Sequence, residues 1–436
     1  MALHDQLIAH IQQNAQPLTG PQDLDPLMER IGDARLVLLG EASHGTSEYY
    51  TWRAQITKRL IREKGFSFIG VEGDWPDSYT VNRYIKNYPD SGESAYELLH
   101  AYNRWPTWMW ANWEVVALVE WLRRHNLTMP EKDRVGFYGL DVYSLWESLA
   151  EITRYLQTVD DDAVEAARQA YTCFQPYDRN AQAYAWASQF VPSSCESAVM
   201  NLLTATERLT RHMPEGDGES AFNAAQNARS VAGAEHYYRS MIPGGATSWN
   251  IRDHHMVDTL ANLLEHHGPE SKAIIWEHNT HIGDARATDM AVDGMVNVGQ
   301  LVRERWGEDQ CVLVGFSSNR GTVIAGNAWD GPMEEMRVPR ARPDSWDGLF
   351  HEALDGKNAL VIFQHTEDDA FQHIRPQRAI GVVYHPQYES RGNYIPTSLA
   401  NRYDVLLYID ETRALHPLHV QEEAHMEPPE TYPWAV

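Results

Sequence analysis

The sequence predicts an α/β protein with a mostly parallel central sheet that is flanked by helices. Residues 35–39 form a short apolar run closed by Gly40, which is typical of a strand buried on both faces. A helical pattern then runs from Ser47, a candidate cap, to about Lys64, and residues 66–71 form a second apolar run. Strand, helix and strand at this spacing form a βαβ unit, whose strands lie parallel.

The remaining elements follow in order along the chain. Pro76 is well placed in the first turn of a helix over residues 75–85, and another helix is expected to reach His125. Residues 144–246 lack strand signals and have helical spacing, so we expect a helical insertion that forms a lid over the cleft, within a single domain spanning residues 1–436. Later helices are expected from Ser248 or Asn250 to about 266, and over 294–306. Further strands are expected at 135–140, 273–276, 311–316, 321–325, 359–363, 380–384 and 405–409.

Composition excludes several classes of protein. The chain has 436 residues, of which 43% are hydrophobic and 22% charged, as in soluble globular proteins. A net charge of −25 argues against binding to nucleic acid or to an anionic membrane surface. The three cysteines do not suggest a disulfide framework, and no signal peptide or membrane span is recognisable. We therefore expect a cytoplasmic protein with a small-molecule partner, and the sequence does not indicate an oligomeric state.

Acidic residues or histidines directly follow four of the expected strands. Because the carboxyl ends of parallel strands share one edge of a sheet, these side chains should gather where ligands bind in open α/β sheets. Apolar strands do not need carboxylates at their ends, and gathering several of them costs repulsion and desolvation. The residues are Glu41 and His44, Glu72, Asp141, and Glu277, His278 and His281.

Two chemical interpretations of this cluster remain open. The chain has no G-x-S-x-G, Walker or G-x-G-x-x-G motif, so a serine nucleophile and a phosphate cradle lack support. In the first interpretation a histidine takes a proton from water, Glu41 or Glu72 orients it, and an arginine or second histidine faces the oxyanion. In the second, His44, His278, His281 and carboxylates hold zinc or manganese.

Tryptophans supply the candidate substrate-binding surface. The segment 102–113 contains four of them, and they could line an apolar cleft or pack in the core under a loop. The candidates for substrate contact are Trp75, Trp105, Trp108 and Trp110.

Several segments together resemble the erythromycin esterase family. They include L-G-E-A-S-H-G-T-S-E (39–48), T-W-R-A (51–54), V-E-G-D-W-P (71–76), S-W-N-I-R-D-H-H-M (248–256), W-E-H-N-T-H-I-G-D-A-R-A-T (276–288), G-F-S-S-N-R-G-T-V (315–323) and the region 378–394. The resemblance spans nearly the whole chain, in the family's order.

The resemblance implies an α/β core with a helical subdomain over the cleft. It also implies hydrolysis of a carboxylic ester or macrolactone of the macrolide type, an activity associated with antibiotic resistance, through histidine-activated water and without a covalent serine intermediate or a cofactor. Carried onto matching positions, it makes His44 the base and assigns the other catalytic places to Glu41, Arg53, Glu72, His278 and His281. A metal-dependent hydrolase and a non-catalytic small-molecule binding protein of the same fold remain the alternatives.

Overall fold

A nine-stranded sheet forms the centre of the computed structural model, which describes residues 3–159, 161–177, 179–190, 194–211, 219–242, 245–364 and 369–419. Its strands are β1 (Ala15–Pro17), β2 (Leu36–Leu39), β3 (Phe68–Asp74), β4 (Gly136–Asp141), β5 (Ala273–Trp276), β6 (Cys311–Gly326), β7 (Met333–Val338), β8 (Ala359–Ile362) and β11 (Val405–Thr412). They lie in the order β1-β8-β11-β6-β2-β5-β3-β4, with β7 paired to β6. A separate antiparallel pair consists of β9 (Arg375–Arg378) and β10 (Tyr394–Thr397).

The sheet is mostly parallel, as the sequence predicted. The pairs β11–β6, β6–β2, β2–β5, β5–β3 and β3–β4 are all parallel. Within this sheet, antiparallel pairing is confined to β1–β8, β8–β11 and β6–β7 among the described strands. The carboxyl ends of β2, β3, β4 and β5 therefore meet at one edge.

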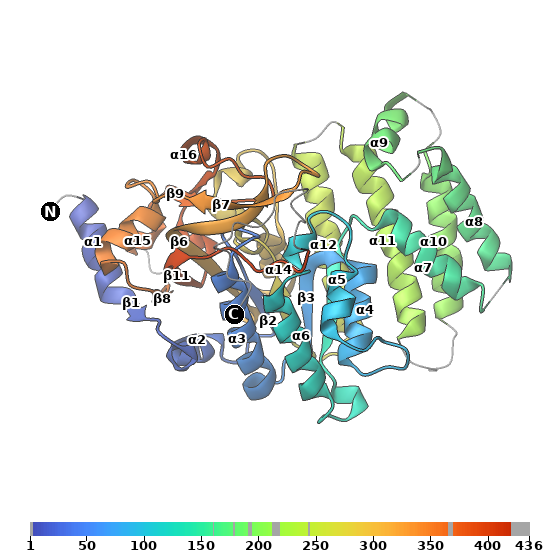
Figure 1. The fold of residues 1–436 in the computed structure, drawn as a ribbon, viewed down its shortest axis with the longest axis horizontal. Coiled ribbons are helices and arrows are strands. Elements are labelled where there is room, and N and C mark those ends of the chain that lie inside the picture. Colours follow the sequence, from blue (N-terminus) through green and yellow to red (C-terminus); the bar gives the residue numbers. More distant parts are fainter. Residues whose placement is uncertain are drawn as a thin grey trace, which may run out of the picture.

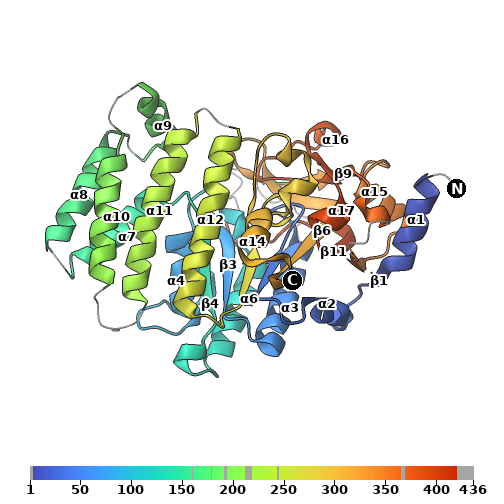
Figure 2. The same cartoon turned by 180° about the vertical axis from the view of Figure 1, so that it is seen from behind.

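Helices cover both faces of this sheet (Figures 1 and 2). Alternate residues of β2 explain the arrangement: Val37 and Leu39 join one core with α3 and α6, whereas Leu36 and Leu38 join a second core with α12 and α14. Burial on both faces is why the strand reads as a continuous apolar run. The helices are α1 (Leu3–Asn14), α2 (Asp25–Ile31), α3 (Ser47–Lys64), α4 (Trp75–Ile85), α5 (Ala95–His100), α6 (Trp113–Asn126), α7 (Leu145–Leu156), α8 (Asp161–Phe174), α9 (Ala181–Phe190), α10 (Glu196–Thr210), α11 (Ser220–Ser240), α12 (Ala246–His267), α13 (Asn279–Ile282), α14 (Val298–Trp306), α15 (Trp346–Leu354), α16 (Glu389–Gly392) and α17 (Leu399–Arg402).

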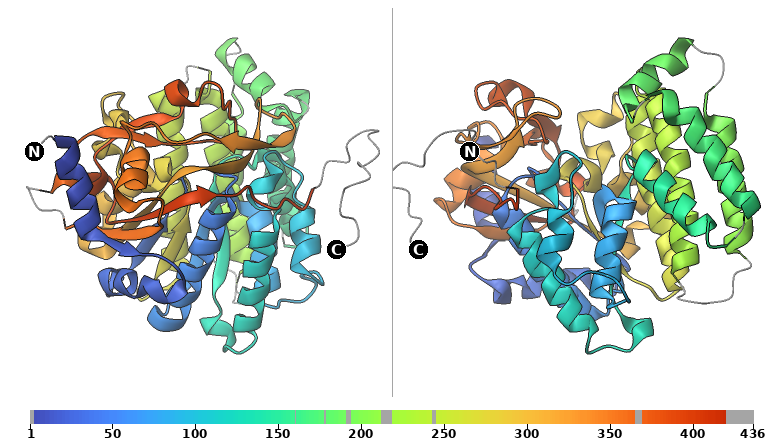
Figure 3. Two further views of the ribbon diagram at one scale, coloured as in Figure 1. Left: turned by 60° about the vertical axis from the view of Figure 1, so that its left-hand side comes forward. Right: turned by 45° about the vertical axis from the view of Figure 1, so that its right-hand side comes forward.

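The predicted insertion corresponds to helices α7 to α11, which stand beside the sheet at one end of the molecule (Figure 3). They enclose a hydrophobic core of their own, which includes Leu149, Leu202 and Val231. Contacts of α11 with α12 and α4 join this layer to the rest of the protein. That the layer acts as a lid stays a prediction. Of the helices described, none combines the length and the apolar character that crossing a membrane demands.

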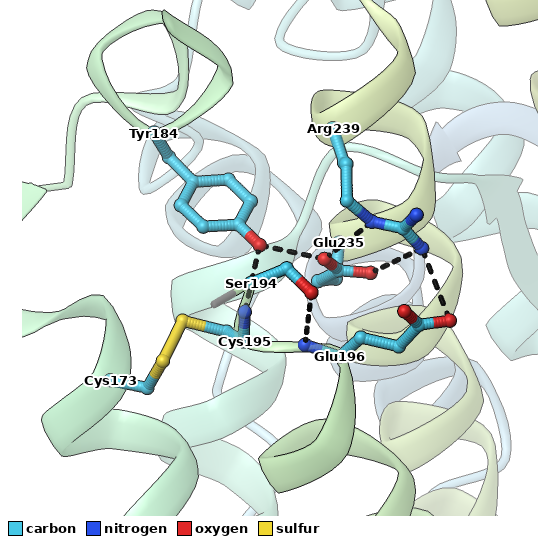
Figure 4. The surroundings of a disulfide bond; sticks show 7 residues. All are labelled: Cys173, Tyr184, Ser194, Cys195, Glu196, Glu235 and Arg239. Carbon is cyan, nitrogen blue, oxygen red and sulfur yellow. Dashed lines mark hydrogen bonds and ion pairs between the residues drawn. A yellow bond between two sulfur atoms is a disulfide. The ribbon is translucent and has the colours of Figure 1, made fainter. Parts of the chain in front are cut away.

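A disulfide bond inside this helical layer departs from the expectation that the cysteines do not pair. Cys173, at the end of α8, is bonded to Cys195, which immediately precedes α10 (Figure 4). The Tyr184 hydroxyl accepts the backbone N–H of Cys195 and donates to Glu235 of α11. The bond therefore joins two helices of the insertion beside a buried polar contact to a third.

Other local expectations were also wrong. Residues 380–384 do not form a strand, because their backbone makes only isolated bridges, Ile380 with Ser43 and Val383 with Gly326. The segment 321–325 is not a separate strand but the second half of β6. Helix α12 begins at Ala246, so neither Ser248 nor Asn250 caps it, and Thr46 rather than Ser47 is the N-cap of α3.

A register shift near the carboxyl end of β3 affects where the residues at this end of the strand lie. The pairing of β3 with β4 is irregular between Val71 and Asp74, the stretch that contains Glu72. Opposite it, Gly139 allows the two backbones to approach: a Cβ at this position would lie 2.2 Å from the carbonyl oxygen of Asp74. Glycine is therefore required here by contact with the backbone of the neighbouring strand.

We expect the substitution Gly139→Ala to destabilise the fold by about 1–3 kcal/mol, because the new methyl group can be accommodated only by moving β3 or β4. Gly392→Ala is the matched control, since a Cβ there meets no atom within 4 Å. Unfolding in denaturant measures both variants. Equal free energies of unfolding for the parent and Gly139→Ala would contradict this description of the β3–β4 contact.

Candidate active site

The strand-end residues meet at the carboxyl edge of the sheet, as the sequence predicted. Glu41 and His44 follow β2, Glu72 lies in the irregular part of β3, Asp141 ends β4, and two histidines follow β5. All of them are buried, with at most 7% of any residue exposed. Hydrogen bonds connect them into two groups that share the region around Glu72.

The first group consists of His44, Glu41 and Arg53. Nδ1 of His44 donates to Oε1 of Glu41 at 2.8 Å, and Nη2 of Arg53 donates to Oε2 of the same carboxylate at 2.6 Å. The Arg53 guanidinium is fully buried and lies over the rings of Tyr50 and Trp276, at 4.3 and 4.6 Å from their centroids. Arg53 thus holds one carboxylate oxygen of Glu41, and the other oxygen fixes the orientation of the His44 ring.

The bond to Glu41 determines which His44 nitrogen can accept a proton. Because a carboxylate only accepts, the proton of neutral His44 lies on Nδ1, and the lone pair is on Nε2. Nε2 makes no hydrogen bond to the described residues. Burial by itself lowers the pKa of His44, but the charge of Glu72 and the hydrogen bond and charge of Glu41 outweigh it, so the pKa lies above its ordinary value of 6.5.

The second group is built around Arg252 of α12. Its Nε and Nη2 donate to the two oxygens of Asp141 at 2.9 and 2.7 Å, and Nη2 also donates to Oε1 of Glu72 at 2.7 Å. Burial would raise the pKa of Glu72, but the charges that His281 and His44 carry when protonated, together with Arg252, hold it well below its ordinary value. Burial likewise opposes ionisation of Asp141, and Arg252 lowers its pKa nonetheless. Both carboxylates are therefore ionised at neutral pH.

His281 is held between Arg252 and Asp253. Nη1 of Arg252 donates to Nε2 of His281 at 3.0 Å, since a guanidinium cannot accept. Nδ1 of His281 then donates to Oδ1 of Asp253 at 2.9 Å. The imidazole is stacked on Trp249, with ring planes 4° apart. His281 is consequently held in a fixed orientation, in which it supports Arg252.

His278 lies against His44, with ring centroids 4.8 Å apart. Its Nδ1 accepts the backbone N–H of Thr280 at 3.2 Å, so the proton of its neutral form is on Nε2. Its own backbone N–H donates to Oε2 of Glu72 at 2.8 Å. Burial, and then the nearby charge of His44, lower the pKa of His278 well below 6.5. Of the two neighbouring rings, His44 is therefore the one that takes up a proton.

Glu277 lies in the same region but has a different character. It is fully buried, and neither of its carboxyl oxygens makes a hydrogen bond within the described part of the chain. Burial, followed by the charges of Glu72 and Asp253, raises its pKa well above the ordinary value. A neutral carboxyl is a poor metal ligand. Among the described residues, no group of three or more His, Cys, Asp or Glu side chains is arranged to hold a metal ion.

A cleft of about 130 Å³ opens onto this cluster. Four of the residues proposed from the sequence line it, namely His44, Glu72, Trp105 and Trp110. Glu41, His278 and His281 are not part of the lining but contact lining residues, and Arg53 lies behind them, bonded to Glu41. No described residue between 144 and 246 is part of the lining.

Two of the proposed substrate-binding residues belong to the core instead. Trp75 is 1% exposed, stacks on Tyr138 and donates its indole N–H to Asn223. Trp108 is equally buried and packs edge-on against Trp105. Both are large aromatic side chains whose burial contributes to core packing.

Arg252 and Asp253 belong to this cluster, and the strand-end pattern in the sequence did not predict them. They lie on a helix far from the strand ends in sequence, so the strand-end pattern could not reveal them. The available signal was the segment 248–256, one of those that resemble the family, in which Arg252 and Asp253 are adjacent. Asp141 was noted at a strand end but was not among the expected catalytic residues.

Comparisons with known proteins find sequences that are similar to this chain over most of its length. A family model described as erythromycin esterase matches residues 61–412. The chain is 25% identical to erythromycin esterase type II of Escherichia coli over 369 residues, which cover 80% of this chain and 85% of that protein. It is 21% identical to the putative hydrolase YbfO of Bacillus subtilis over 384 residues, which cover 82% and 81% of the two chains.

Solved structures share the fold. A succinoglycan biosynthesis protein superposes with a TM-score of 0.75 at 22% identity, over 95% of this chain and 99% of that one. The erythromycin esterase EreC, in its open conformation, gives a TM-score of 0.64 at 15% identity, over 91% and 96% of the two chains. At these identities the likeness extends to the mixed α/β architecture alone.

Replacing Glu72 by Gln should lower stability at pH 7 by about 1–3 kcal/mol, because it leaves Arg252 and the His278 N–H with a weaker acceptor. A carboxylate whose pKa is depressed by folding adds stability above its unfolded pKa, about 4.3, and that contribution is lost as pH falls. The difference between parent and Glu72→Gln should therefore shrink in acid. Denaturant unfolding from pH 7 to pH 3 measures it.

The exposed Glu29 provides a control for this measurement, because the described residues give it no ion pair. Glu29→Gln should match the parent throughout. A Glu72→Gln deficit that stayed constant with pH would mean that the ionised carboxylate is not what stabilises the site.

Proposed function

The chain belongs to the erythromycin esterase family, as its sequence motifs indicated, and we propose that it is a carboxylic ester hydrolase in which His44 activates water. Family membership supports the broader statement that the protein is a hydrolase. The observation that supports the finer one is the orientation of His44: Nδ1 is bound to Glu41, and the residue lines the cleft beside Glu72 and Arg252. A neutral imidazole held in this way is a general base.

The reaction proceeds by direct attack of water. Nε2 of His44 takes a proton from water while the water oxygen bonds to the acyl carbon. The tetrahedral intermediate collapses with cleavage of the carbon–oxygen ester bond, and the imidazolium returns the proton to the departing alkoxide. Glu41 and Glu72 stabilise the imidazolium between these two steps, which is consistent with their raising the pKa of His44.

Arg252 is the group we assign to the developing oxyanion. Its guanidinium lines the cleft beside His44 and is kept in place by Asp141, Glu72 and His281. A fixed cation next to the reacting carbonyl stabilises the transition state without reorganising during the reaction. Arg53 is excluded from this role because it is buried behind Glu41.

Ser43 does not fit the role of nucleophile. Its hydroxyl is hydrogen-bonded to that of Thr46, it is 4% exposed, and it is not part of the cleft lining.

Among esters, we propose a lactone of the macrolide type, since the Escherichia coli relative is named an erythromycin esterase. The aromatic lining of Trp105 and Trp110 suits a large, mostly apolar substrate.

The variant His44→Asn tests the proposed base. It should fold normally and lose about 10²–10⁴-fold in kcat, the usual contribution of general base catalysis. Ser43→Ala is the matched control and should retain most activity. Hydrolysis of a macrolide and of simpler esters, detected by product mass, is the assay. A trapped acyl-enzyme on Ser43, or full activity of His44→Asn, would refute the mechanism.

The pH dependence provides an independent test. Because imidazolium cannot accept a proton, kcat/KM should fall as pH drops through the pKa of His44, which lies above 6.5. Glu72 is the largest of the influences that raise this pKa, so Glu72→Gln should move the acid limb to lower pH. An acid limb below pH 6, or one that Glu72→Gln leaves in place, would assign the titration to another group.

A further inference from the structure

The two histidines that follow β5 lie on one short helical turn, α13. His278 is the N-cap residue of this turn, His281 is its third residue, and Gly283 is its C-cap residue. A helix of four residues is not stable by itself, because the few hydrogen bonds that it forms do not offset the unfavourable nucleation. The position of α13 must therefore be set by contacts with the rest of the protein.

Asn297, the N-cap residue of α14, is hydrogen-bonded to this turn. Its Nδ2 donates to the carbonyl oxygen of Thr280 at 2.8 Å and to that of Gly283. Its Oδ1 accepts the backbone N–H of Ala285 at 3.2 Å and that of Gln300 at 3.0 Å. The residue is completely buried, and its amide uses both donors and accepts twice. Among side chains of this length, only that of asparagine offers two donors together with an acceptor.

These bonds fix the backbone next to each histidine. Thr280, whose carbonyl group Asn297 holds, donates its own N–H to Nδ1 of His278 at 3.2 Å, and its hydroxyl lies 2.8 Å from the same nitrogen. Gly283, whose carbonyl group Asn297 also holds, comes two residues after His281. A shift of the turn would therefore displace both rings.

The next residue of α14 supports His281 through Asp253. The backbone N–H of Val298 donates to Oδ1 of Asp253 at 3.0 Å, and the same oxygen accepts the Nδ1 hydrogen of His281 at 2.9 Å. The partial positive charge at the start of a helix favours the ionised form of a carboxylate placed there. Since Nε2 of His281 accepts a hydrogen bond from Arg252, the first turn of α14 is connected to the guanidinium through one aspartate and one histidine.

Helix α14 lies beside α12 (Figure 2), and its backbone also lies against α13. A Cβ at residue 299 would be 2.1 Å from the carbonyl oxygen of Ile282, so the close approach requires Gly299. This approach is what allows the short side chain of Asn297 to reach two carbonyl groups of the turn.

We propose that Asn297 is a positioning residue for hydrolysis, which holds the turn of His278 and His281 in the place where it supports Glu72 and Arg252. The backbone N–H of His278 bonds to Glu72, and the ring of His281 bonds to Arg252. Asn297 itself is not part of the cleft lining. The inference rests on the proposed function for the reaction, but the alignment of the two rings does not depend on it.

The variant Asn297→Asp tests this role. Aspartate caps a helix as well as asparagine does, so α14 should be preserved while the two donors to the turn are lost. We expect kcat to fall about 10–100-fold, since a displacement of about 1 Å can cost about 10²-fold in rate. Because Asn297 does not line the cleft, KM should be unchanged, so that kcat and kcat/KM fall together.

Asn126, the last residue of α6, provides the control. It is equally buried, its amide donates to the carbonyl oxygens of Ile85 and Val135 at 3.0 and 2.9 Å, and it accepts the backbone N–H of Val135 at 2.8 Å. These contacts lie before β4, at the edge of the sheet opposite the cleft. Asn126→Asp should lower the stability to denaturant as Asn297→Asp does, but it should leave kcat intact. An equal loss of kcat in both variants would reduce the effect to general destabilisation and overturn the proposal.

Nitrogen NMR of histidine-labelled protein reports on the rings without any substrate. In the parent, the neutral form of His278 carries its proton on Nε2 and that of His281 on Nδ1. The two sets of signals are assigned by their loss in His278→Asn and in His281→Asn. In Asn297→Asp both should shift toward a mixture of tautomers, whereas Asn126→Asp should leave them in place.

Because aspartate adds a charge at a buried position, Asn297→Ser is the second variant. Serine also caps helices, but its single hydroxyl cannot donate to both carbonyl groups. It should show the same loss of kcat and the same change of the ring signals. Parental kcat and parental ring signals in either folded variant would overturn the proposal.

The two measurements separate this proposal from the proposed function. If the parent hydrolyses no ester but the Asn297 variants alter the signals of His278 and His281, the esterase assignment fails and the positioning of the rings stands. If the parent hydrolyses esters and the variants change neither kcat nor the signals, the proposed function stands and Asn297 has no positioning role.

Discussion

The guanidinium of Arg252 is the interaction on which the site depends. Burying the carboxylates of Glu72 and Asp141 at one edge of a sheet is unfavourable unless a cation and its hydrogen bonds offset the loss of water. Arg252 bonds both carboxylates and the His281 ring at distances of 2.7–3.0 Å. Because it comes from α12, it couples the packing of that helix to the ends of β3 and β4. The fold and the site are therefore stabilised by the same contacts.

The neighbouring imidazoles illustrate how environment separates two groups of the same type. His44 and His278 lie with ring centroids 4.8 Å apart, yet the pKa of His44 is raised and that of His278 is lowered well below 6.5. Both rings are buried, but His44 donates its Nδ1 hydrogen to Glu41, whereas Nδ1 of His278 accepts a backbone N–H. When the surroundings of two similar groups move their pKa values apart, the group with the higher pKa is the better proton acceptor. This difference favours His44 as the proton acceptor.

Much of the fold could be predicted because its strands are buried on both faces. Apolar runs such as 36–39 and 273–276 became strands where expected, and parallel pairing then brought Glu41, Glu72 and His278 together. Contacts that depend on distant segments could not be predicted. Residues 380–384 have the apolar character of a strand, but their backbone makes only isolated bridges. Nothing local in the sequence distinguishes buried Trp108 from Trp105 in the cleft, pairs Cys173 with Cys195, or joins Arg252 to Glu72. The catalytic roles themselves stay predictions.

The protonation of His44 is the most direct test of this account. Nitrogen NMR of histidine-labelled protein, with the His44 signals assigned by their absence in His44→Asn, reports both the tautomer and the pKa. We predict that neutral His44 carries its proton on Nδ1, and that it titrates above pH 6.5 together with the acid limb of hydrolysis. A neutral form protonated on Nε2, or a pKa below 6.5, would contradict the role of this residue as the base that activates water.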